Sequence, residues 1–168
     1  MRIVLPILLA ATLAGAASAA TVGADRGNLV VNGKAITAGG RDSDPVLSPD
    51  GKRVVFVRRG PVVAAMKWCS DETNGTHSVE LWSIAADGRD ARRLLSGLGT
   101  REPKTTVCDF QNMQFSSNGQ LLYFETPAWA TSGAAHVLDL KTGKEHFLMP
   151  SNGLRCSAIA AMRIIATT

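Results

Sequence analysis

A short motif that occurs twice limits the folds open to this chain of 168 residues more than any other feature. Residues 43–57, SDPVLSPDGKRVVFV, combine a short strand, a Pro-Asp-Gly turn and a strand of alternating apolar residues. Residues 113–125, MQFSSNGQLLYFE, repeat the pattern around a Ser-Asn-Gly turn. An internal repeat of a hairpin predicts a chain built from similar small sheets that stack on one another.

Each copy of the motif begins a unit of four expected strands. The units share their turns and differ mainly in one irregular insertion, at 60–77 in the first unit and at 126–134 in the second. An Asn32-Gly33 turn between apolar runs predicts one further hairpin ahead of the first unit, because both turn positions tolerate positive φ. The expected strands are 46–47, 53–58, 78–84 and 91–95 in the first unit and 112–115, 121–125, 136–140 and 145–148 in the second.

The first copy of the motif resembles the signature of the TolB-like β-propeller repeat, a WD40-like unit of secreted and periplasmic bacterial proteins. The second copy keeps the turn but replaces the proline by Ser117. The resemblance covers residues 28–150 and implies an all-β fold of two to three stacked, antiparallel, four-stranded propeller-type blades. The residues that carry it are Pro45, Ser48, Pro49, Asp50 and Gly51 in the first copy and Asn118 and Gly119 in the second.

The chain is too short to close a propeller by itself. Propellers typically have about four to eight blades of about 40 to 45 residues each. We therefore expect an incomplete β-propeller, whose outer sheets lack the neighbours that would bury their faces. Three outcomes remain open: an open stack, a ring completed by a protein partner or by self-association, and a fragment of a longer parent protein.

The N-terminus has the features of a secretory signal peptide. Arg2 precedes an apolar stretch that ends in Ala17-Ser18-Ala19, so we expect residues 1–19 to be removed by cleavage near Ala19-Ala20. The mature chain would then be periplasmic or secreted by a bacterium, with a retained anchor as the alternative. The later apolar stretches are too short to span a bilayer, so we expect no transmembrane span in the mature chain.

The rest of the chain divides into one domain and a tail. Residues 20–150 are expected to form the TolB-like propeller-repeat domain. Residues 151–168 lack both strand alternation and turn signals, so we expect an irregular or short helical tail. The alternative is that this terminus is truncated or frame-altered. The formal net charge of +4 is too small to indicate a nucleic-acid partner.

The three cysteines of an exported chain favour a disulfide. Cys69 and Cys108 are the expected pair, because both flank the irregular middle of the first unit, and Cys156 is then left over. Three unpaired thiols are the alternative. The cysteine and histidine spacings do not match a zinc site.

Catalytic and metal-binding patterns are weak. The chain has no Gly-x-Ser-x-Gly motif, and His77, His136 and His146 have no evident partners in the sequence. Asp42, Asp44 and Asp50 cluster around the first turn, but their spacing does not match a calcium loop. We therefore predict no catalytic residue, no metal ligand and no cofactor.

Two tryptophans are the candidate recognition residues. Trp68 and Trp129 both lie in the insertion that follows the second strand of their unit, and equivalent loops emerge on one side of a blade stack. They are expected to form a recognition patch for a peptide or a glycan. The alternative is that each ring only plugs the end of its own sheet. Trp82 lies in an alternating strand and is expected in the core.

These features lead to an expected function of exported, noncatalytic protein-binding module in the bacterial cell envelope. The resemblance supports binding of proteins, because TolB-like propellers are implied by family to bind proteins of the envelope. The alternative is an accessory or substrate-screening propeller portion of an exported hydrolase or peptidase, whose catalytic part is absent from this chain. The repeat is shared by many functions, so it does not identify a particular partner.

Overall fold

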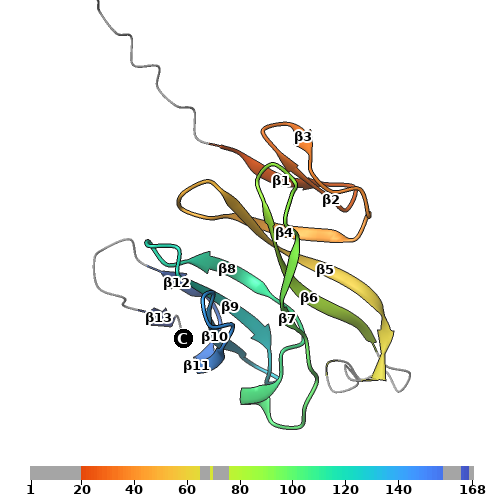
Figure 1. Ribbon diagram of the computed structural model, residues 1–168. Helices are drawn as coiled ribbons and strands as arrows, with labels where there is room; N and C mark the ends of the chain where they lie inside the picture. Colours follow the sequence, from red (N-terminus) through yellow and green to blue (C-terminus); the bar gives the residue numbers. More distant parts are fainter. Residues whose placement is uncertain (1–19, 65–68, 70–75, 157–163, 167–168) are drawn as a thin grey trace, which may run out of the picture.

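The computed structural model describes residues 20–64, 69, 76–156 and 164–166. These residues form an all-β protein in which consecutive strands of each sheet are antiparallel neighbours. The sheets succeed one another through the molecule in chain order (Figure 1). The expected incomplete β-propeller, built of propeller-type blades, is confirmed.

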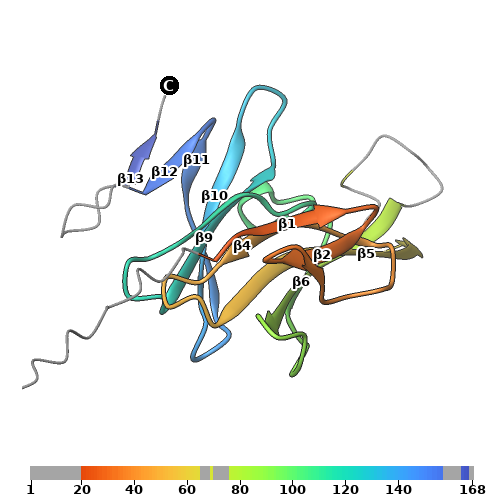
Figure 2. The same ribbon diagram turned by 90° about the horizontal axis from the view of Figure 1, so that it is seen from above.

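The described strands belong to four sheets. Sheet 1 contains β1 (Val22–Asp25), β2 (Asn28–Val31) and β3 (Lys34–Ala35). Sheet 2 contains β4 (Asp42–Leu47), β5 (Arg53–Val63), β6 (Thr76–Ala85) and β7 (Arg92–Ser96). Sheet 3 contains β8 (Gln111–Phe115), β9 (Leu121–Pro127), β10 (Gly133–Asp139) and β11 (Glu145–Ser151). Sheet 4 pairs β12 (Leu154–Cys156) with β13 (Ile164–Ala166), and a short 3₁₀ helix, η2 (Pro103–Thr105), lies between sheets 2 and 3 in sequence. In the view from above, β1 and β2 of sheet 1 lie over β4, β5 and β6 of sheet 2 (Figure 2).

The two motif turns have the same hydrogen bonds. In the first turn the Ser48 hydroxyl donates to Asp50 Oδ1 over 2.6 Å and accepts from the Arg53 amide over 3.0 Å. In the second turn the Ser116 hydroxyl donates to Asn118 Oδ1 over 2.7 Å and accepts from the Leu121 amide over 2.9 Å. An asparagine oxygen therefore replaces the aspartate oxygen with no loss of a bond, which explains why the altered second copy still forms its hairpin.

Glycine completes both turns, since the residue after Asp50 or Asn118 has positive φ. Gly51 has φ of 70° and Gly119 has φ of 68°, a region that residues with a Cβ enter at a cost of about 1 kcal/mol. Each strand that enters a motif turn also has a β-bulge, at Asp44 in β4 and at Asn112 in β8. The repeat seen in the sequence thus extends to the backbone of the turn and of the strand that enters it.

Alternation along the central strands divides the hydrophobic core. In β5, Val54 and Phe56 face sheet 1, whereas Val55 and Val57 face sheet 3. In β9, Leu122 and Phe124 face sheet 2, and Tyr123 packs with Leu154 of sheet 4. Each central sheet therefore covers two cores, one on each face. The core between sheets 2 and 3 contains Val55, Val57, Val79, Leu81, Val107, Phe110, Met113, Leu122, Phe124 and Leu138.

The structure adds strands that the sequence did not indicate. β1 forms a hairpin with β2 through a turn in which Arg26 and Gly27 both have positive φ, at 48° and 74°. β5 and β6 reach into the expected insertion, with their pairing continuing to Val63 opposite Thr76.

Trp82, which was expected in the core, is half-buried and packs against the core between sheets 1 and 2.

The expectation of an irregular or helical tail is wrong where the tail is described. Residues 154–156 and 164–166 pair as antiparallel strands, and Leu154 is buried against Tyr123 and Ala135 of sheet 3. Tertiary packing, not local alternation, selects strands here. The expected signal peptide and residues 157–163 and 167–168 lie outside the described residues.

Candidate recognition surface

Two adjoining hollows lie where β8 begins and where β9 ends. The first has a volume of about 560 Å³ and is bounded by the edge strands β4 and β8. The second has a volume of about 340 Å³ and extends to the loop between β9 and β10. Gln111 and Asn112 line both hollows, so the two form one continuous surface, which we call the Asn112 surface. Its other principal members are Asp44, Pro45, Asp109, Glu125, Trp129, Thr131 and Asn152.

A buried carboxylate supports the second hollow. Glu125 is only 5% exposed, and its oxygens accept hydrogen bonds from Ser151 Oγ at 2.5 Å, Asn112 Nδ2 at 2.5 Å and the Gly153 amide at 3.0 Å. Burial by itself raises the pKa of Glu125, but these hydrogen bonds outweigh it and hold the pKa below its usual value. The side chain is therefore a fixed negative charge at neutral pH.

Glu125 stands where the first unit has an apolar residue. Counting from the turn glycines, Glu125 corresponds to Val57, which lies in the core between sheets 2 and 3. In the second unit the same strand position faces the turn that leads into β12, where Ser151 and Gly153 supply donors. The charge is thus accommodated by residues of the tail, on the far side of sheet 3 from sheet 2.

The structure places one of the two predicted tryptophans in this surface. Trp129 is half-buried in the loop between β9 and β10, where it lines the second hollow. Its ring also meets Phe147 edge-on, with centroids 6.2 Å apart, and its amide donates to the carbonyl of Ser132. The ring is therefore held in position while one part of it borders the hollow. Trp68 lies outside the described residues.

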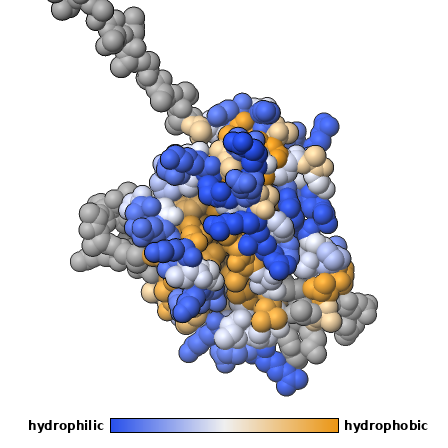
Figure 3. All heavy atoms as spheres, in the orientation of Figure 1, coloured by the Kyte–Doolittle hydropathy of each residue, from blue (hydrophilic) through white to orange (hydrophobic). Residues whose placement is uncertain are grey.

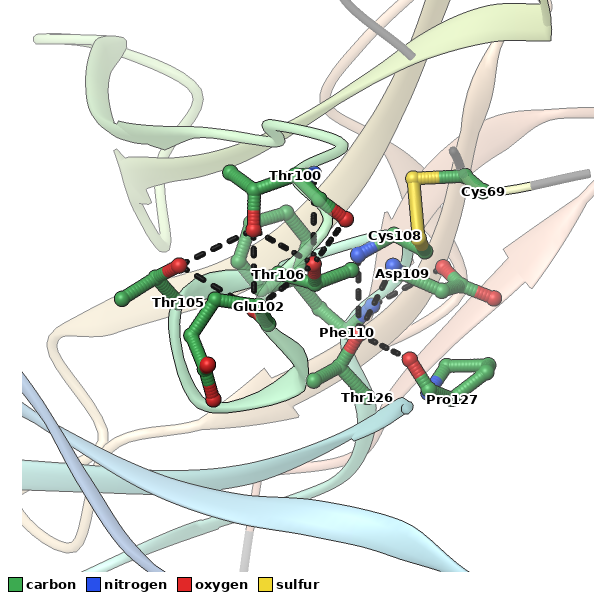
Figure 4. The surroundings of a disulfide bond; sticks show 10 residues. All are labelled: Cys69, Thr100, Glu102, Thr105, Thr106, Cys108, Asp109, Phe110, Thr126 and Pro127. Carbon is green, nitrogen blue, oxygen red and sulfur yellow. Dashed lines mark hydrogen bonds between the residues drawn. A yellow bond between two sulfur atoms is a disulfide. The ribbon is translucent and has the colours of Figure 1, made fainter. Parts of the chain in front are cut away.

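The predicted cysteine pair forms a disulfide beside the same surface. Cys69 and Cys108 are bonded, with their Cα atoms 5.1 Å apart (Figure 4). The amides of Cys108 and Asp109 both donate to Thr126 Oγ1, over 2.8 and 3.3 Å, and Thr126 is 1% exposed. The bridge therefore ties the insertion after β5 to the segment that leads into β8, and Asp109 is fixed at the border of the first hollow.

The motif residues are divided between two ends of the sheets. Pro45 borders the first hollow of the Asn112 surface. Ser48, Pro49, Asp50, Asn118 and Gly119 instead line a separate cleft at the opposite end of β4 and β8, and Gly51 lies in the turn beside it. The turn signature and the predicted tryptophan site are consequently distinct places on the molecule.

Sequence reasoning did not identify the polar residues of the Asn112 surface. A signal was present for Glu125, because the match of apolar residues between the two units ends at that position. Asn112 also had a signal, since it aligns with Asp44, and Asn and Asp tolerate positive φ better than most residues. In the structure both residues have positive φ, at 50° and 51°. Ser151 and Gly153 had none, because they reach Glu125 only through the packing of the tail.

Two of the described histidines, His77 and His136, have structural partners. His136 is fully buried between Phe124 and Phe147, and its Nδ1 bonds to Glu145. Among the described residues its Nε2 has no hydrogen-bond partner. His77 Nδ1 bonds to the carbonyl of Gly60 over 2.8 Å. Within the described ranges, neither ring is bonded to a hydroxyl or thiol, and no group of three or more His, Cys, Asp or Glu side chains is arranged to hold a metal ion.

The sheets define the protein as an incomplete β-propeller, and solved propellers resemble it. The β-propeller domain of the trilobed protease from Pyrococcus furiosus is 13% identical, with a TM-score of 0.44 over 78% of this chain and 37% of its own. A structure named for a dipeptidyl aminopeptidase IV from Bacteroides ovatus is 16% identical, with a TM-score of 0.47 over 75% of this chain and 21% of its own. TolB from Acinetobacter baumannii is 16% identical, with a TM-score of 0.34 over 79% of this chain and 40% of its own.

This chain spans less than half the length of each of these structures. No protein-family model matches the sequence, and no curated protein matches it. In the part of the chain that the structure describes, no helix is long and apolar enough to cross a membrane.

Proposed function

We propose that the chain is an exported, noncatalytic protein-binding module that holds a basic peptide segment of a partner on the Asn112 surface. The observation that carries this proposal is the charge of the surface. Asp44, Asp109 and Glu125 line the two hollows, and no lysine or arginine is among the lining residues. Lysine or arginine side chains of a partner would complement this surface.

The strand edges support binding of an extended segment. β4 and β8 are the first strands of their sheets, and each has one side without a partner strand among the described residues. Both strands border the first hollow, so main-chain groups are available to an extended peptide there. The bulges at Asp44 and Asn112 interrupt each edge, which restricts pairing to a short segment and opposes aggregation through the edges.

Trp129 supports recognition of a cation. Its ring is held by Phe147 and lies in the same hollow as the carboxylate of Glu125. A guanidinium or ammonium group beside a tryptophan ring gains about 0.5 to 2 kcal/mol from the ring quadrupole. A basic side chain would therefore have both an aromatic ring and a negative field in the second hollow.

Selection from a library of phage-displayed twelve-residue random peptides tests this function. We expect the purified protein to enrich peptides rich in lysine and arginine, with binding that weakens as salt rises. Trp129→Ala should weaken the best peptide by about tenfold or more, the loss typical of a binding hot spot. Asp109→Asn should weaken it less, and Asp87→Asn, an exposed change in the turn between β6 and β7, serves as the charge-matched control.

Three results would contradict the proposal. They are enrichment of acidic or uncharged peptides, tight binding to a glycan array with no peptide enriched, and equal affinity of the Trp129→Ala and wild-type proteins. The export part of the proposal rests on the signal-like N-terminus. It is tested by sequencing the N-terminus of the protein from a periplasmic fraction, where we expect the chain to begin near Ala20.

A further inference from the structure

A second cleft lies between sheets 2 and 3, beside the two motif turns. It has a volume of about 420 Å³ and is at the opposite end of β9 from the Asn112 surface. In the space-filling view, hydrophobic residues form a strip near the centre of the face that is flanked by hydrophilic ones (Figure 3). The apolar residues of the cleft are Val55, Leu94, Phe115 and Leu140, and the polar ones include Arg53, Ser83, Arg92 and Asp50.

One wall of the cleft is a row of polar side chains across sheet 2. Ser83 of β6 pairs in register with Arg92 of β7, and Arg53 of β5 reaches Ser83 by a hydrogen bond from Nε to Oγ of 2.8 Å. Arg53 also donates from Nη2 to the carbonyl of Asp90 over 3.0 Å. Both acceptors are uncharged, so these bonds orient the guanidinium but do not neutralise it.

The two arginines lack an anionic partner in the described part of the chain. The arginines that form ion pairs there are Arg58 with Asp42, Arg89 with Asp87 and Arg93 with Glu80. Arg53 and Arg92 are not among them. Asp50 borders the cleft, but its carboxylate accepts the Ser48 hydroxyl and the Lys52 amide within its own turn. A guanidinium beside an apolar wall is the arrangement that a carboxylate with a hydrocarbon part would satisfy.

The second unit shows that a blade does not need charge at this row. Leu121 corresponds to Arg53, and Val137, which pairs with Tyr123 as Ser83 pairs with Val55, corresponds to Ser83. Leu121 and Val137 pack against the core that Tyr123 forms with Leu154. The same strand positions are thus apolar in one blade and polar in the other, so the requirements of the fold do not explain Arg53.

We propose that this cleft binds a small monocarboxylate that carries an apolar chain, with the carboxylate on Arg53 and Arg92 and the chain against Phe115, Leu140 and Leu94. The negative charge of Asp50 at the rim disfavours ligands with a second anionic group. Because the cleft is remote from the Asn112 surface, this site is independent of the proposed peptide-binding function.

Isothermal titration of the full exported protein with octanoate tests the proposal. We expect octanoate to bind, and acetate and octyltrimethylammonium, which lack the chain and the negative charge respectively, not to bind. Arg53→Leu, which introduces the residue of the second unit, should weaken octanoate by about tenfold or more, because a charged hydrogen-bond donor is lost. Lys52→Gln removes one positive charge outside the cleft, copies Gln120 of the second unit and should leave affinity unchanged.

The ligand comparison decides the proposal even if Arg53→Leu fails to fold. No binding of octanoate at millimolar concentration, or equal binding of octyltrimethylammonium, would overturn it, as would unchanged affinity in folded Arg53→Leu. N-acetyl-leucyl-leucine separates two sources of the same chemistry. Tighter binding of this dipeptide acid than of octanoate assigns the cleft to a peptide C-terminus, and the reverse order assigns it to a fatty acid.

Discussion

Arg58 and Asp42 form a two-pronged ion pair across β4 and β5, with Nε–Oδ1 of 2.6 Å and Nη2–Oδ2 of 2.9 Å. The Asp42 side chain is fully buried, and the Arg58 guanidinium lies over the rings of Phe56 and Trp82 at 5.1 and 4.7 Å. Hydrogen bonding to Asp42 raises the pKa of Arg58, so its charge is permanent. The pair therefore joins the edge strand β4 to β5 next to the core that sheet 2 shares with sheet 1.

Arg58→Met should destabilise the protein by about 3 kcal/mol, because the buried Asp42 carboxylate loses its counter-ion. The double variant Asp42→Leu/Arg58→Met should lose less than Arg58→Met alone, since no buried charge remains. Urea unfolding followed by circular dichroism measures both. The control is Asp87→Asn, which breaks the exposed pair with Arg89 and should have no measurable effect. Equal stability of Arg58→Met and the wild type would show that the pair is not structural.

Asp50→Asn and Asn118→Asp should change the acid sensitivity of stability in opposite directions. The Ser48 hydroxyl and the Lys52 amide lower the pKa of Asp50, so its carboxylate stabilises the folded state above the unfolded pKa and loses this effect as the pH falls through the folded value. Asp50→Asn should therefore reduce the acid dependence below the ordinary pKa of 3.8, and Asn118→Asp should increase it. Thermal unfolding from pH 7 to pH 2 measures the effect, and identical profiles would contradict it.

Glu125→Gln should remove a second acid-sensitive contribution. Burial alone raises the pKa of Glu125, but hydrogen bonds from Ser151, Asn112 and the Gly153 amide lower it below 4.5, so stability is present above that pH and is lost as the pH falls. Glu125→Val, which introduces the residue of the first unit, should cost about 1 to 3 kcal/mol at pH 7 because it leaves these donors without an acceptor. Denaturant unfolding at two pH values separates the effects. A Glu125→Val protein as stable as the wild type would show that the cluster contributes nothing.

Cys69→Ser/Cys108→Ser should lower the free energy of unfolding by about 2 to 4 kcal/mol, because the unfolded chain regains the freedom of a loop closed over a separation of 39 residues. Guanidinium unfolding with and without a reductant measures the loss. The reductant should reproduce the effect of the double substitution in the wild type and have no effect in the variant. If the reductant destabilises both proteins equally, its effect does not come from breaking the bond between Cys69 and Cys108.

Local turn chemistry explains why much of the fold was predictable. The Asn32-Gly33, Asp50-Gly51 and Asn118-Gly119 turns each placed a hairpin correctly, because the residues that allow positive φ or accept the turn hydrogen bonds are local in sequence. The strands of sheets 2 and 3 followed from alternation around those turns. β1 was missed because its four residues, VGAD, are mostly small and too few to show the alternation of a strand.

Long-range contacts explain what was missed in the candidate site. The position of Trp129 after the second strand of its unit is visible in the repeat, and the structure places it in a hollow. The role of Glu125 depends on Ser151 and Gly153, which are 26 and 28 residues away. The strands of the tail depend in the same way on burial of Leu154 against sheet 3. Neither contact is encoded by a local pattern.

The disulfide also determines which part of the chain can bear mechanical load. β6 and β7 lie between Cys69 and Cys108 in sequence, so tension applied to the two ends of the chain passes through the sulfur atoms and bypasses this hairpin. In a single-molecule pulling experiment, the oxidised chain should extend about 140 Å less than the reduced chain, the contour of about 39 residues at about 3.6 Å each. In the oxidised chain, β6 and β7 therefore bear no tension between the two ends of the chain, whereas β4 and β5 do.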